Sequence, residues 1–86
     1  MTAAERLEEI GYPDAIVFTN YAYDSALIGV TTDGRAVYSY EKMVDDLMEN
    51  EGMTYDNAVE WIDYNTIRAL PYMGEDAPIV MYNMWE

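Results

Sequence analysis

Carboxylates are the reactive groups that this chain offers in number. Its 86 residues include 17 Asp and Glu against four Lys and Arg, giving a formal net charge of −13, and they include neither His nor Cys. The usual general base, the usual nucleophile–base pairs and most zinc ligand sets are therefore missing. Paired carboxylates hydrolyse glycosides only across a substrate cleft, for which a chain this short has little room. We expect no enzyme, no cofactor and no metal site.

The acids gather in one part of the chain. Eight of them lie between residues 41 and 63, with Lys42 as the one base among them. Two sets have helical spacing, i, i+4, i+8 in the first and i, i+4, i+7 in the second. Residues four apart rise about 6 Å along a helix, close to the phosphate spacing of a nucleic-acid strand. The residues expected to bind a partner are Glu41, Asp45, Asp46, Glu49, Asp56, Glu60 and Asp63, with Tyr55 and Tyr64 beside them.

These two acidic rows could form a binding surface or could be solvated helix faces without a binding role. Like charges at i, i+4 destabilise a helix by about 0.2–0.5 kcal/mol per pair, and an ordinary solvated helix mixes both signs. Rows kept at that cost favour a surface that imitates a phosphate backbone. The bland alternative is that both rows are the solvated faces of amphipathic helices.

The net charge narrows the class of partner. Nucleic acids and anionic membranes would repel the chain, whereas long-range steering favours a cationic surface. The leading hypothesis is an inhibitor that blocks a basic nucleic-acid-binding surface by mimicry. The alternative is a protein-interaction module or accessory subunit without mimicry, which binds through Tyr21, Tyr23 or the final strand, since Tyr is enriched at interface hot spots.

Capping and turn signals predict the elements that carry the acids. Thr2 with Glu5 forms a capping-box pattern, and Ser39 and Thr54 are further N-cap candidates. Asp33-Gly34 favours a tight hairpin turn. The expected helices cover residues 3–10, 40–52 and 55–68, the last closed by Leu70-Pro71, and the expected strands cover 15–19, 26–31, 36–38 and 78–84, with a bulge or close contact at Gly29.

This element order, α-β-β-β-α-α-β, predicts the fold class. We expect an α+β protein with a small antiparallel sheet, helices packed on one face, and a single domain over residues 1–86. No apolar run is long enough for a membrane helix, and the acidic, amphipathic start differs from a secretory signal. The expected location is the cytoplasm.

Three stretches look familiar: YPDAIVF at 12–18, YDSALIGV at 23–30 and WIDYNTIRALPY at 61–72. They resemble a group of short acidic, mostly uncharacterised proteins of gut bacteria and their phages and mobile elements. The resemblance covers most of the chain, transfers no known active site, and implies a mobile-element setting with the host cell's cytoplasm as the location. Small acidic proteins of that setting include inhibitors of CRISPR nucleases and other DNA mimics, an analogy of size and charge alone. By this analogy, the most specific target of the expected inhibitor is a CRISPR effector.

Overall fold

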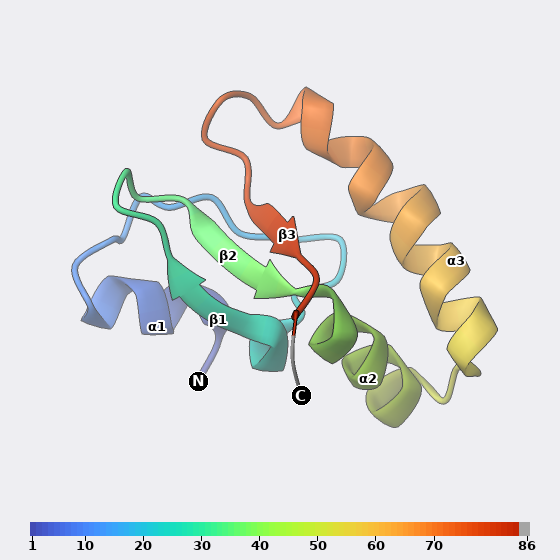
Figure 1. Ribbon diagram of the computed structural model, residues 1–86. Coiled ribbons are helices and arrows are strands. Elements are labelled where there is room, and N and C mark those ends of the chain that lie inside the picture. Colours follow the sequence, from blue (N-terminus) through green and yellow to red (C-terminus); the bar gives the residue numbers. More distant parts are fainter. Residues whose placement is uncertain (85–86) are drawn as a thin grey trace.

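The computed structural model describes residues 1–84, in which the α-helices lie below a small mixed sheet and to one side of it in the view of Figure 1. The elements in chain order are α1 (Ala3–Glu9), the 3-10 helix η1 (Asp24–Ala26), β1 (Leu27–Val30), β2 (Ala36–Ser39), α2 (Tyr40–Glu51), α3 (Tyr55–Asn65), the 3-10 helix η2 (Ile67–Tyr72) and β3 (Ile79–Met81). The α+β class is confirmed, and the order α-β-β-α-α-β has one strand fewer than predicted.

The helix starts follow the predicted caps. The Thr2 hydroxyl accepts the backbone N–H of Glu5 at 3.1 Å, and the Glu5 carboxylate accepts the N–H of Thr2 at 2.9 Å. Ser39 and Thr54 each accept the backbone N–H three residues later, which starts α2 and α3. Gly52 ends α2 at a φ of 68°, a left-handed conformation that costs glycine little.

The predicted hairpin is present. β1 pairs antiparallel with β2, and the N–H of Thr31 donates to the carbonyl of Arg35 at 2.8 Å to close the turn. Gly34 has a φ of 87° in that turn, which explains the Asp-Gly signal. The pairing register shifts between Leu27 and Gly29, so the bulge expected near Gly29 is also confirmed.

The sheet is mixed, which corrects the antiparallel prediction. β3 lies beside β2 and runs parallel to it, with Tyr38 opposite Val80. The chain between these two strands forms α2, α3 and η2, and a crossover of that length is what parallel pairing requires. β3 covers only three of the seven residues expected.

The prediction of a strand over residues 15–19 is wrong. In the described chain this segment is extended but pairs with neither β1, β2 nor β3. Its apolar side chains are used for packing instead, because Phe18 is buried and its ring lies 4.8 Å from that of Tyr38. Ala15 and Val17 are partly buried against the same core, so this apolar run contributes packing instead of strand pairing.

The end of the third helix also differs from the prediction. α3 ends at Asn65, and the chain tightens into η2, where the N–H of Ala69 donates to Thr66 at 3.2 Å. Pro71 lies inside this 3-10 helix rather than after the helical segment. A short 3-10 stretch is common at a helix C-terminus.

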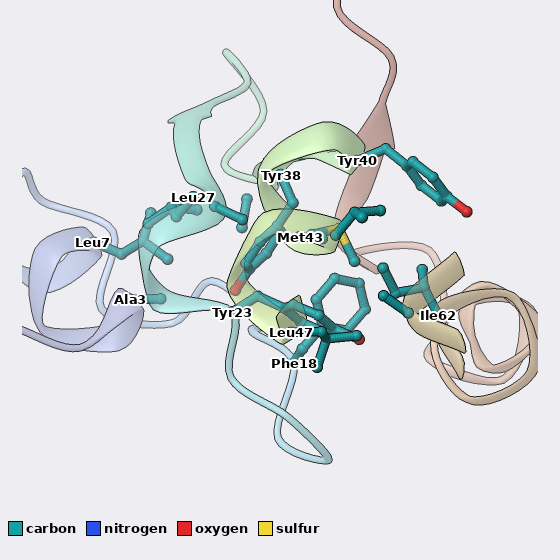
Figure 2. Close-up of a cluster of buried hydrophobic side chains, with 14 residues drawn as sticks. Ala3, Leu7, Phe18, Tyr23, Leu27, Tyr38, Tyr40, Met43, Leu47 and Ile62 are labelled. Atoms are coloured by element: carbon teal, nitrogen blue, oxygen red, sulfur yellow. The ribbon is translucent and has the colours of Figure 1, made fainter. Parts of the chain in front are cut away.

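The core connects every helix to the sheet (Figure 2). Leu7 of α1, Met43 and Leu47 of α2, and Ile62 of α3 join Tyr38 of β2 in one buried cluster. Burying one such aliphatic side chain contributes about 1.5–3 kcal/mol. Since these residues anchor α2 and α3 to the core by one side, the opposite sides of both helices face solvent.

Candidate protein-binding surface on α2 and α3

The first acidic row lies on the outer side of α2. Asp45 and Glu49 are exposed, opposite the buried Met43 and Leu47. Glu41 is half-buried, and its carboxylate accepts the backbone N–H of Asn83 at 3.1 Å. Glu41 therefore fixes the chain after β3, while Asp45 and Glu49 remain available to a partner.

Asp46 does not belong to this surface, and its prediction as a binding residue is corrected. Its side chain is 7% exposed and accepts a hydrogen bond from the Asn50 amide. Burial raises the pKa of Asp46, with smaller opposing effects from hydrogen bonds to Asn50 and Ser25. The i, i+1 spacing from Asp45 turns it toward the segment before β1, which a one-dimensional acid count does not show.

The second row lies on α3 and is also divided. Asp56 and Glu60 are exposed. Asp63 is exposed too, but it accepts a hydrogen bond from the Tyr40 hydroxyl at 3.0 Å. Burial and the nearby Asp63 carboxylate together raise the pKa of Tyr40. Asp63 thus links α3 to the start of α2 in addition to any contact with a partner.

The two tyrosines predicted beside the acids are exposed on α3, Tyr55 at 61% and Tyr64 at 64%. Two further tyrosines were missed. Tyr72 in η2 is also exposed, and Tyr82, which its strand position suggested as a core residue, is 65% exposed with its ring 4.9 Å from that of Tyr40. The short β3 explains the second miss, because Tyr82 follows the strand rather than lying in it.

The tyrosines of the alternative surface are less exposed than Tyr55 and Tyr64 of α3. Tyr23 is buried and Tyr21 half-buried, so neither forms an exposed patch. The Tyr23 hydroxyl is hydrogen-bonded to that of Thr66 at 2.8 Å, and burial raises the pKa of Tyr23 to about 12. Among the alternative's candidates, the segment from β3 onward includes the most exposed side chains.

The basic residues do little to offset the acids. Arg6 and Arg35 donate to the backbone carbonyls of Asp24 and Ala77, at 3.0 and 2.9 Å. The Arg68 guanidinium lies over the ring of Tyr64, 5.0 Å from its centroid. The arginines are therefore engaged with carbonyls and a ring, away from the exposed carboxylates of α2.

A groove of about 560 Å³ lies along α3 and the turn before it. It is lined by Met53, Asn57, Glu60, Trp61, Tyr64 and Asn65. The spacing of the α3 residues could have indicated that they share one side of a helix. The apolar pattern of the sequence instead predicts that Trp61 is a core residue. The structure leaves Trp61 half-buried, so its indole both packs inward and contributes to the groove.

Aromatic contacts hold the Trp61 ring in place. Tyr21 and Tyr23 meet it edge-on, with centroids 6.4 and 6.5 Å away and interplanar angles of 77° and 64°. Tyr23 adopts a left-handed backbone with a φ of 49°, unusual for a residue other than glycine. Trp61 therefore brings to the lining of the groove an aromatic ring that is packed against two tyrosines.

Neither a metal site nor a membrane-spanning helix is found in the part of the chain that the structure describes. Among residues 1–84, no group of three or more acidic side chains is arranged to hold a metal ion. No helix in that same range has the length and apolar character needed to cross a bilayer. Comparison with known protein families, curated proteins and solved structures gives no significant match to this chain.

Proposed function

We propose that this protein is an inhibitor that occupies a cationic nucleic-acid-binding surface of another protein, most specifically that of a CRISPR effector. Exposed carboxylates of α2 and α3 would take the place of phosphates. Asp45, Glu49, Asp56 and Glu60 are exposed acids that would do so, with Tyr55 and Tyr64 of α3 beside them. This would place it in the host cytoplasm as a mobile-element product.

The observation that carries the proposal is the placement of acids at the C-terminal end of α2, where the helix dipole makes negative charge unfavourable. Glu49 and Glu51 lie in its last turn, which has no basic residue. A helix C-terminus carries partial negative charge, so each acid there costs about 0.3–1 kcal/mol at low salt. Asp45 and Glu49 add i, i+4 repulsion. Acids that destabilise their own helix are expected where their electrostatic field serves to bind a partner.

The supporting evidence is that this field is not neutralised locally. Lys42 is the one base in the acidic segment, and it is exposed on α2. The rest of the acidic surface can therefore steer a basic partner and match its potential. Steering of this kind falls steeply with ionic strength.

A charge-matched pair of variants tests where binding occurs. The first carries Asp45→Lys, Glu49→Lys and Glu60→Lys. The control carries the same three reversals on or near α1, at Glu8, Glu9 and Asp14, which are all exposed. Each reversal adds two charges, so both variants change from −13 to −7. Figure 1 shows α1 and α3 at opposite ends of the molecule.

Inhibition of DNA cleavage by a panel of purified CRISPR effectors is the readout, with circular dichroism to confirm that both variants fold. We expect the α2–α3 variant to lose inhibition by at least about tenfold and the α1 control to stay near the wild type, because contact charges act locally at physiological salt. Equal inhibition by both variants would contradict a binding site on α2 and α3. Inhibition of no effector by the wild type would remove the CRISPR version.

A second candidate function rests on the exposed residues after β3. Tyr82 is 65% exposed, and Met84 is exposed beyond it. A protein-interaction module without mimicry would bind through these side chains. Its binding would depend weakly on salt and would be lost on Tyr82→Ala, whereas the triple reversal on α2 and α3 would leave it intact.

A further inference from the structure

We propose that the α3 groove, lined by Met53, Asn57, Glu60, Trp61, Tyr64 and Asn65, binds an arginine side chain of the basic partner. This inference rests on the proposed function and names the chemistry that one part of the surface would recognise. The carboxylate rows would supply long-range attraction. The groove would supply a specific contact, in which a guanidinium lies against an aromatic floor beside a carboxylate.

The floor of the groove suits a flat cation. Trp61 carries the type of aromatic ring that attracts cations most strongly, and Tyr21 and Tyr23 pack against it in T-shaped contacts. Met53 extends the apolar surface against which the aliphatic part of an arginine side chain would pack. Because the indole is already fixed in the free protein, little side-chain entropy would be lost on binding.

The polar groups of the groove match the donors of a guanidinium. Glu60 is exposed in the lining and can accept two parallel N–H bonds. Asn57, one turn before it, carries a side-chain carbonyl as a further acceptor. Arginine uses such sites better than lysine, since its planar fork both stacks on a ring and pairs with a carboxylate.

The chain itself places a guanidinium against one residue of this groove lining. Arg68 lies over Tyr64 with its central carbon 5.0 Å from the ring centroid, inside the range of a cation–π contact. Tyr64 is also part of the groove lining. An observed guanidinium on a groove residue is an indication of ligand type that does not depend on counting acids.

Size and charge select among other occupants. A volume of about 560 Å³ falls within the usual range of ligand pockets, so one or two side chains fit. An anionic ligand would meet Glu60 and a net charge of −13. A neutral apolar ligand would leave Glu60 and Asn57 without a role. The arginine side chain uses the aromatic, carboxylate and amide groups together.

The test uses short peptides and the full chain. Acetyl-Gly-Arg-Gly-amide is titrated into the protein, with matched peptides that carry lysine or citrulline in place of arginine. A Trp85→Phe background leaves Trp61 as the one source of an indole N–H signal in NMR spectra. We expect a saturable shift of that signal with the arginine peptide, a weaker one with lysine and none with citrulline.

Two matched variants locate the contact. Glu60→Gln should weaken arginine-peptide binding by about two- to fivefold, the range of one partly screened ion pair. Glu8→Gln removes the same charge on α1 and should leave the affinity unchanged. A citrulline peptide that binds as tightly as arginine, equal effects of the two variants, or no saturable shift at millimolar peptide would each overturn the proposal. Because no effector is involved, this outcome is separate from the cleavage test of the proposed function.

Discussion

Replacing Glu49 by lysine should make the protein more stable and a weaker binder at the same time. Glu49 is exposed in the last turn of α2, four residues after Asp45. Glu49→Lys replaces an i, i+4 repulsion by an attraction in the favourable orientation, with the acid N-terminal to the base. It also places a cation at the negative end of the helix dipole.

The magnitude follows from adding the smallest values of these effects. Losing the repulsion and gaining the attraction contribute about 0.2 kcal/mol each, and reversing the dipole interaction contributes about 0.6 kcal/mol. The expected gain is therefore about 1 kcal/mol at low ionic strength. For a chain of this length, that raises Tm by about 4–8 °C.

Thermal unfolding followed by circular dichroism measures this gain. Glu49→Gln is the matched control, which removes the unfavourable charge without adding an attraction and should give about half the rise. The gain should shrink in about 1 M salt, where screening is strong. A Glu49→Lys variant that unfolds at the wild-type temperature or below it, at low salt, would refute the argument that the acids of α2 are kept against stability.

Three further predictions concern the core beneath this surface. Tyr23→Phe should cost about 1 kcal/mol by losing a buried hydrogen bond, and Tyr38→Phe should cost less, because among residues 1–84 the buried Tyr38 hydroxyl makes no well-formed hydrogen bond and has the Phe18 backbone nearby; urea unfolding measures both. Asp46→Asn should gain stability relative to the wild type as pH rises from about 4 to 7. Burial raises the native pKa of Asp46, so the native state holds this proton more tightly than the unfolded state does, and this group lowers wild-type stability as pH increases through that range. Unfolding free energies of the two proteins that keep a constant difference across pH would contradict this. Ile62→Ala should cost about 2–5 kcal/mol and lower the urea midpoint strongly, since Ile62 is fully buried where α3 meets the core, and a loss under 1 kcal/mol would contradict that packing.

The parts of the fold that local chemistry determines could be predicted from the sequence. Thr2, Ser39 and Thr54 begin helices because a side-chain oxygen can satisfy a free N–H of the first turn, whatever the rest of the chain does. Gly34 and Gly52 adopt positive φ where the hairpin turns and where α2 ends. Such signals need no knowledge of distant residues.

The parts that depend on distant residues could not be predicted. The run at 15–19 has strand composition but finds a packing site instead of a strand partner, and β3 pairs parallel because of the crossover through α2 and α3. The same limit applies to the surface. Asp46 is buried by the segment before β1, and Trp61 is only half-buried. The exposure of these two side chains depends on residues far away in the sequence, so neither the exposed acids nor the groove could be predicted from spacing alone.

The most direct test of the central claim is the salt dependence of partner capture. A tagged chain is incubated with a nuclease-treated lysate of CRISPR-bearing cells at about 0.1 and about 0.5 M salt, and captured proteins are identified by mass spectrometry. The account predicts a basic nucleic-acid-binding effector that is retained at low salt, lost at high salt and released by added nucleic acid. A partner that is retained equally at both salt concentrations and is unaffected by nucleic acid would contradict it.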